Sequence, residues 1–132
     1  MTRKCIISAA VMFVMAWALS FVVHVWLLAP DYAALQWMRP PADQQKIIYF
    51  IVLAQAIFGA AFAWVYYQGK EDKPWLMQGI RFGIAVACLT VIPTYLIYHV
   101  VTPVPLVLAL KQIVLDTIRV VLMGIVLAWI NR

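Results

Sequence analysis

The chain has 132 residues, of which 67% are hydrophobic and 11% are charged, and its formal net charge is +5. Soluble domains are about half apolar and about a quarter charged, so this composition excludes a water-soluble globular protein and predicts an integral membrane protein. Most Lys and Arg residues lie between apolar runs, where such residues set the orientation of membrane helices. We therefore expect the lipid bilayer, and not nucleic acid, as the partner of this charge.

Four apolar runs are each long enough to cross a hydrocarbon core, which takes about 20 helical residues. They cover about residues 5–29, 47–67, 75–101 and 106–130, with an outer loop at 30–46. The first run exceeds the apolar part of a signal peptide, which favours an uncleaved helix over a cleaved leader. Because the other loops are short, we expect one all-α membrane domain over 1–132, an antiparallel up-down bundle of four transmembrane helices.

The distribution of basic residues predicts the orientation of this bundle. One side carries five of them near the span ends: Arg3, Lys4, Lys70, Lys73 and Arg132. The opposite side carries Arg39 and Lys46. Since Lys and Arg are enriched in cytoplasmic loops, this bias predicts cytoplasmic N- and C-termini.

Small residues recur every four positions along the third run, at Gly79, Gly83 and Ala87. Such a stripe lets two membrane helices approach closely, either within one chain or between the subunits of an oligomer. Pro93 lies later in the same run and should bend it, because proline removes one helical hydrogen bond. Thr90 or a neighbouring helix is expected to bond the carbonyl that Pro93 leaves without a donor.

The fourth run contains charged residues in the segment "KQIVLDTIR". At about 100° per residue, Gln112, Asp116 and Arg119 share a narrow stripe and Lys111 stands to one side of it. We call these four residues the polar seam. Asp116 and Arg119 are three residues apart on one helix, a spacing at which opposite charges pair.

Depth makes this pair a candidate site. Counted from Leu106 by helical rise, Asp116 and Arg119 lie about 15 and 20 Å into the span, near the centre of the bilayer. Lys111 lies only about 7 Å deep and is able to extend to the outer surface. Ionisable residues at the bilayer centre are costly and often functional, whereas a buried ion pair also serves to fix helix register. Both interpretations of the pair remain open on sequence grounds.

A second polar group is predicted near the outer ends of the helices, at the level of Lys111. It contains two histidines with neighbouring polar side chains: His24, His99, Tyr95, Tyr98 and Gln55. Interfacial placement accounts for the histidines, and a haem or metal held between them is an alternative that requires the two imidazoles to face each other. No carboxylate or cysteine lies beside them to complete a zinc site, so we expect no metal and no cofactor.

The chain resembles a group of small, hypothetical bacterial inner-membrane proteins with four helices. The resemblance rests on "RPP", "GKEDKPWLMQGIRFG", "PTYLIY" and "KQIVLDTIRVVLMG" and covers about residues 30–130. It implies a location in the bacterial inner membrane, but the group has no established activity from which site residues can be transferred. In size and helix count the chain is also similar to small multidrug-resistance transporters, but its first helix lacks the acidic residue that those proteins carry there.

Three functions follow as expectations. No hydrolase, phosphate-loop or metalloprotease motif is present, so we expect a non-enzymatic membrane protein that acts as an accessory subunit or an oligomeric scaffold. A small oligomeric transporter or ion pathway that uses Asp116 is the first alternative. A redox protein that binds haem or metal through His24 and His99 is the second.

Overall fold

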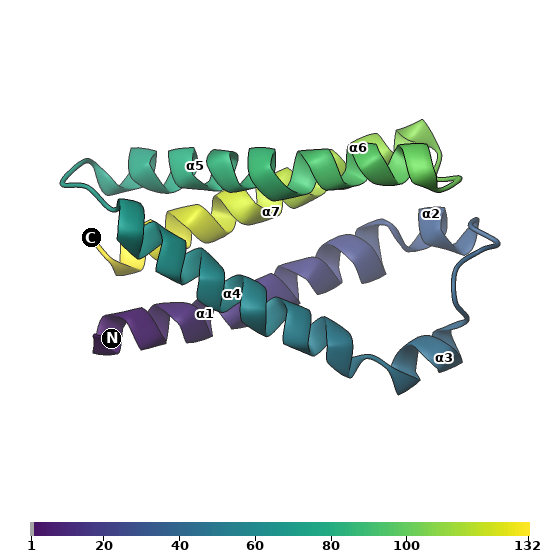
Figure 1. Cartoon of the computed structure of the whole chain (residues 1–132), viewed down its shortest axis with the longest axis horizontal. Coiled ribbons are helices and arrows are strands. Elements are labelled where there is room, and N and C mark those ends of the chain that lie inside the picture. The colour runs from purple at the N-terminus through teal and green to yellow at the C-terminus, as the bar shows by residue number, and fades with distance from the viewer. Residues whose placement is uncertain (1) are drawn as a thin grey trace. The chain divides into compact units, whose positions relative to one another are not determined.

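The computed structural model describes residues 2–132 and divides into two compact units, Met1–Tyr67 and Gln68–Arg132 (Figure 1). Every regular element in the described part of the chain is helical. Four helical stretches are long and apolar enough to cross a membrane: Arg3–Leu27, Tyr49–Gly69, Trp75–Val101 and Leu106–Ile130. The prediction of an all-α protein with four helices long and apolar enough to span a membrane is therefore confirmed, and each of these helices begins and ends within two residues of the expected range.

The first unit contains two long helices and the connection between them. Helix α1 (Arg3–Phe21) continues into a wider π-helical segment, η1 (Val22–Leu27), and α4 (Tyr49–Gly69) forms the second span. A Cβ atom built on Gly59 would lie 2.6 Å from the Phe13 backbone nitrogen, so the α1 and α4 backbones touch where they cross (Figure 1). The buried Ser8 hydroxyl lies 3.3 Å from the Tyr67 hydroxyl. Glycine at the crossing thus allows the close packing that membrane helices rely on.

Proline residues divide the connection between these spans into short helices. Helix α2 (Ala29–Ala33) has Pro30 in its first turn, and α3 (Pro41–Lys46) begins with Pro41. Proline suits the first turn of a helix because that position needs no N–H donor. Pro40 precedes α3 in an extended conformation, with φ −56° and ψ 145°. Proline placement therefore determines where the short helices of this connection form.

The second unit contains the third and fourth spans. The third span consists of α5 (Trp75–Val86), the π-helical segment η2 (Ala87–Val91) and α6 (Ile92–Val101), and the fourth is α7 (Leu106–Ile130). A Cβ on Gly83 would lie 2.5 Å from the Val121 Cα, and one on Gly79 would lie 2.6 Å from the Gly124 carbonyl oxygen. The glycines of the predicted stripe therefore face the α7 backbone, and Ala87 of the same stripe is 1% exposed.

The short loop between α4 and α5 is fixed by polar contacts. The Gln78 side chain accepts a hydrogen bond from the Glu71 N–H (2.6 Å) and donates one to the Glu71 carbonyl (3.2 Å). Lys73 pairs with the Glu71 carboxylate, and the Lys70 ammonium donates to the Asn131 carbonyl (2.5 Å) at the end of α7. These contacts hold the loop against the first turn of α5 and the C-terminal end of the chain.

The third span changes its winding directly before Pro93. The Ile92 N–H bonds to the Ala87 carbonyl five residues earlier, which is the wider hydrogen-bond spacing of a π-helix. The Thr90 hydroxyl donates to the Val86 carbonyl at 2.8 Å. Pro93 has no N–H, so in an α-helix the carbonyl that lacks a donor is that of Leu89, four residues earlier. Thr90 was expected to bond that carbonyl, but its hydroxyl bonds the Val86 carbonyl.

Candidate functional site

Gln112 and Asp116 of the polar seam lie on the buried face of α7. Buried residues recur every three or four positions along this helix: Leu108, Ala109, Gln112, Asp116, Val120, Met123, Gly124, Leu127 and Ala128. Gln112 is 9% exposed and Asp116 is 2% exposed, whereas Lys111 is exposed. Two of the four seam residues thus occupy positions that an ordinary membrane helix would fill with apolar or small side chains.

Asp116 and Arg119 form the ion pair that their spacing predicts. The Arg119 Nε lies 3.0 Å from the Asp116 Oδ1, and the two side chains are 13% and 2% exposed. These atoms are close enough to pair, but they do not have the alignment of a hydrogen bond. The attraction is therefore mainly between charges, and burial reduces its screening by water.

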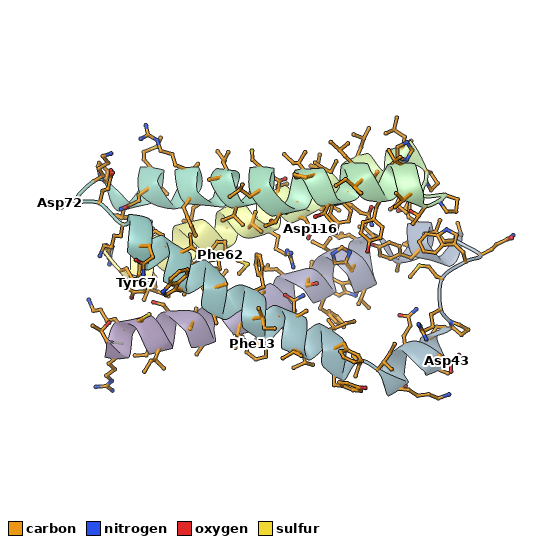
Figure 2. All side chains as sticks on the ribbon, viewed as in Figure 1. Phe13, Asp43, Phe62, Tyr67, Asp72 and Asp116 are labelled. Carbon is orange, nitrogen blue, oxygen red and sulfur yellow. The ribbon has the colours of Figure 1, made fainter. Side chains whose placement is uncertain are left out.

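Tyr95 supplies a directed hydrogen bond to the same carboxylate. Its hydroxyl donates to the Asp116 Oδ2, which connects α6 to α7. Asp116 is labelled in Figure 2. A hydrogen bond to an ionised acceptor is about twice as strong as one between neutral groups. Asp116 therefore has one partner on its own helix and one on the neighbouring helix of its unit, and we call these three residues the Asp116 cluster: Tyr95, Asp116 and Arg119.

Sequence reasoning assigned Tyr95 to the outer pocket and did not link it to Asp116. In a helix the side chains lean toward the N-terminus, so a tyrosine hydroxyl lies well before its own Cα along the axis. Placing residues by the depth of their Cα atoms misses this displacement. The sequence did contain a signal for this contact. Counted by helical rise, Tyr95 and Asp116 lie at depths in the membrane that differ by less than two helical turns.

The remaining residues of the predicted outer pocket have separate surroundings within their own units. In the first unit, the His24 Nδ1 lies 2.6 Å from the Tyr32 hydroxyl, the two rings are stacked 6.0 Å apart, and Gln55 is half-buried on α4. In the second unit, the His99 Nδ1 donates to the Val104 carbonyl at 2.7 Å, and Tyr98 is 52% exposed. The outer pocket and the pairing of the two histidines stay predictions.

The described residues 2–132 bring no cluster of metal-binding side chains together. No group of three His, Cys, Asp or Glu side chains in that range is close enough to hold an ion. Each histidine instead has a local hydrogen-bond partner on a nearby segment of its own unit, Tyr32 for His24 and Val104 for His99. Such contacts fix the orientation of an imidazole ring whether or not it binds a ligand.

A separate hollow lies in the first unit, at the end of the first span. Its volume is about 430 Å³, and its polar lining consists of His24, Tyr32, Arg39 and Gln44. Apolar residues such as Leu35 and Met38 form the remainder. The sequence predicted only an outer loop here, at 30–46, and no hollow.

Comparisons with protein-family models, with curated proteins and with solved structures found no match for this chain.

Proposed function

We propose that this chain is a multi-pass protein of a bacterial inner membrane and serves as a non-enzymatic subunit of a larger membrane assembly. The observation that carries this proposal is the exposure of the third span. In its most apolar part only 11% of the residues are buried within the chain. Leu89 is 78% exposed and Val100 is 82% exposed. A span with so little internal packing has most of its surface available to lipid or to another protein.

The proposed arrangement is an antiparallel up-down bundle with both termini in the cytoplasm. Contacts of Gly79 with Gly124, of Gly83 with Val121 and of Tyr95 with Asp116 follow opposite directions along the two spans of the second unit, which supports this arrangement. Lys and Arg are more frequent at the span ends on the side of the two chain termini than on the opposite side, which supports the orientation. In this arrangement the Asp116 cluster stabilises the packing of α6 against α7, and this structural role requires no substrate.

The test is a mass measurement of the full chain purified in a mild detergent or in nanodiscs. We expect a homo-oligomer or a stable complex with another membrane protein. Leu89→Trp, on the exposed third span, should weaken the assembly, while Val14→Trp, at a 61% exposed position on α1, should leave it intact. A strictly monomeric protein that co-purifies with no other protein would contradict the proposal.

A second candidate is a proton- or cation-linked pathway through an oligomer, favoured by the nearly complete burial of Asp116. A carboxylate near the centre of a span, with a hydroxyl donor and a guanidinium beside it, is a typical position for a coupling group. The test is proton or solute flux into liposomes that contain the native chain, Asp116→Asn or Asp43→Asn. Loss of flux in Asp116→Asn alone would support this function, whereas equal flux in all three would exclude a role for Asp116.

A further inference from the structure

The hollow at the end of the first span has both polar and apolar residues in its lining. Its wall is made by η1, α2, α3 and the segment between α2 and α3, all within the first unit. Because the first span ends at Leu27 and the second begins at Tyr49, this connection lies where the chain leaves the hydrocarbon core. A ligand here would contact headgroup-level water at one end and apolar side chains at the other.

The polar lining favours an anion. Arg39, His24, Tyr32 and Gln44 are the polar residues that line the hollow, and none of its lining residues is acidic. The nearby Asp43 is paired with Lys46 at 2.8 Å. Arginine is well suited to a carboxylate or phosphate because its planar group offers several N–H donors in a fixed geometry.

Local contacts hold this lining in place. The Gln44 side chain donates to the Arg39 carbonyl at 2.5 Å, which ties the start of α3 to the segment before it. Pro40 and Pro41 restrict the backbone between these two residues. On the opposite wall, the contact between His24 and Tyr32 joins η1 to α2. A preformed lining reduces the entropy that binding costs.

We propose that this hollow binds a membrane-resident anionic amphiphile, with its headgroup at Arg39 and its chain against Leu35 and Met38. The volume of about 430 Å³ lies in the range of about 300–1,000 Å³ that is typical of small-molecule pockets. It accommodates a headgroup and the first part of a chain, and the rest of the chain extends into lipid. The headgroup is a phosphate of an anionic phospholipid or the carboxylate of a fatty acid.

The test uses the full chain in a neutral detergent, titrated with phosphatidylglycerol, oleate, phosphatidylcholine or inorganic phosphate, with bound ligand counted by native mass spectrometry. We expect saturable binding of phosphatidylglycerol, oleate or both, and little binding of phosphatidylcholine or inorganic phosphate. The stronger of the two anionic ligands identifies the headgroup. Equal binding of phosphatidylcholine, or binding of inorganic phosphate alone, would overturn the proposal.

Two matched variants locate the site. Arg39→Gln should lower the affinity for the anionic ligand at least about tenfold, the size expected for one charge-assisted hydrogen bond. Lys4→Gln removes the same charge from the same unit but lies at the opposite end of the first span and outside the lining, and should change the affinity less than about twofold by screened charge alone. Equal losses in the two variants would show general attraction to basic residues and would overturn the assigned site.

Discussion

Asp116 is 2% exposed and has a charged partner, Arg119, and a hydroxyl partner, Tyr95. We expect Asp116→Ala to lower the free energy of unfolding more than the double variant Asp116→Ala, Arg119→Ala. The single change leaves Arg119, 13% exposed at mid-span, without the Asp116 carboxylate, and a central arginine costs about 2.5–3.5 kcal/mol on insertion scales. The free energy of unfolding of both variants can be measured by steric trapping or by titration with a denaturing detergent.

Tyr95→Phe is the matched control for this cycle, because it removes only the hydroxyl. Its cost should be about 0.6–1.7 kcal/mol, the size of a side-chain hydrogen bond between membrane helices. If the double variant is less stable than Asp116→Ala, then Asp116 and Arg119 are stabilised by separate partners and the ion pair contributes little.

Glu71 provides a prediction in the exposed loop outside the spans. A hydrogen bond from Lys73 and the positive charge of Lys73 lower the pKa of the Glu71 carboxyl, with a smaller contribution from Arg81. Because the folded-state pKa is the lower one, the contact stabilises the loop above the unfolded pKa of about 4.3, and this stability is lost as the pH falls through the folded value.

Lys73→Ala should therefore raise the Glu71 pKa toward its ordinary value, as measured by NMR titration of the labelled carboxyl carbon. Lys70→Ala removes a charge from the same loop but leaves the contact between Glu71 and Lys73, so it should shift the Glu71 pKa less. Equal shifts in the two variants would mean that net loop charge, and not this contact, sets the Glu71 pKa.

At the scale of single residues, helical periodicity was enough to place Gln112, Asp116 and Arg119 on one stripe and to pair the last two. It was not enough to connect Tyr95 with Asp116. That contact depends on the length and lean of a tyrosine side chain and on the packing of α6 against α7, and neither is encoded in the spacing along one helix.

At the scale of helices, close backbone contact makes Gly83 sensitive to the addition of one methyl group. A Cβ there would lie 2.5 Å from the Val121 Cα and 2.9 Å from the Val120 carbonyl oxygen, so α5 and α7 would have to separate. We expect Gly83→Ala to cost about 1–3 kcal/mol, as overpacking usually does. The measurement is the midpoint of unfolding in denaturing detergent.

Gly69→Ala is the matched control, because a Cβ at Gly69 meets no atom within 4 Å. It should be neutral or slightly stabilising, since alanine favours a helix over glycine by up to about 1 kcal/mol. If Gly83→Ala is tolerated equally well, the two helices are not held at this separation and the small-residue stripe has another purpose.

The helices themselves were largely predictable, and their irregular turns were not. Run length and hydropathy identify a span because the bilayer thickness sets the number of residues it needs. The π-helical segment η2 ends two residues before Pro93, so a local irregularity was foreseeable there. The segment η1 has no proline within it, and it contains His24, which contacts Tyr32 beyond the end of the span.

At the scale of the whole molecule, orientation is the property that the sequence supports most directly. Each span is a separate apolar segment, and the insertion machinery responds to the Lys and Arg residues beside it. How the helices pack depends on contacts between distant segments, such as Gly59 with Phe13, and a small-residue motif does not specify its partner.

The proposed orientation is testable with two single-cysteine variants in a background that carries Cys5→Ala and Cys88→Ala. In cells with a permeabilised outer membrane, a membrane-impermeant maleimide should label Ala42→Cys in the outer connection and should not label Asp72→Cys, because that loop is expected in the cytoplasm. Both positions are exposed in the structure, so a difference in labelling reports the side of the membrane. After the inner membrane is disrupted, Asp72→Cys should label as well, which controls for its reactivity. The opposite labelling pattern would show that the orientation is the reverse of the proposed one. Labelling of both positions while the inner membrane is intact would mean that the chain inserts in both directions despite its bias in Lys and Arg.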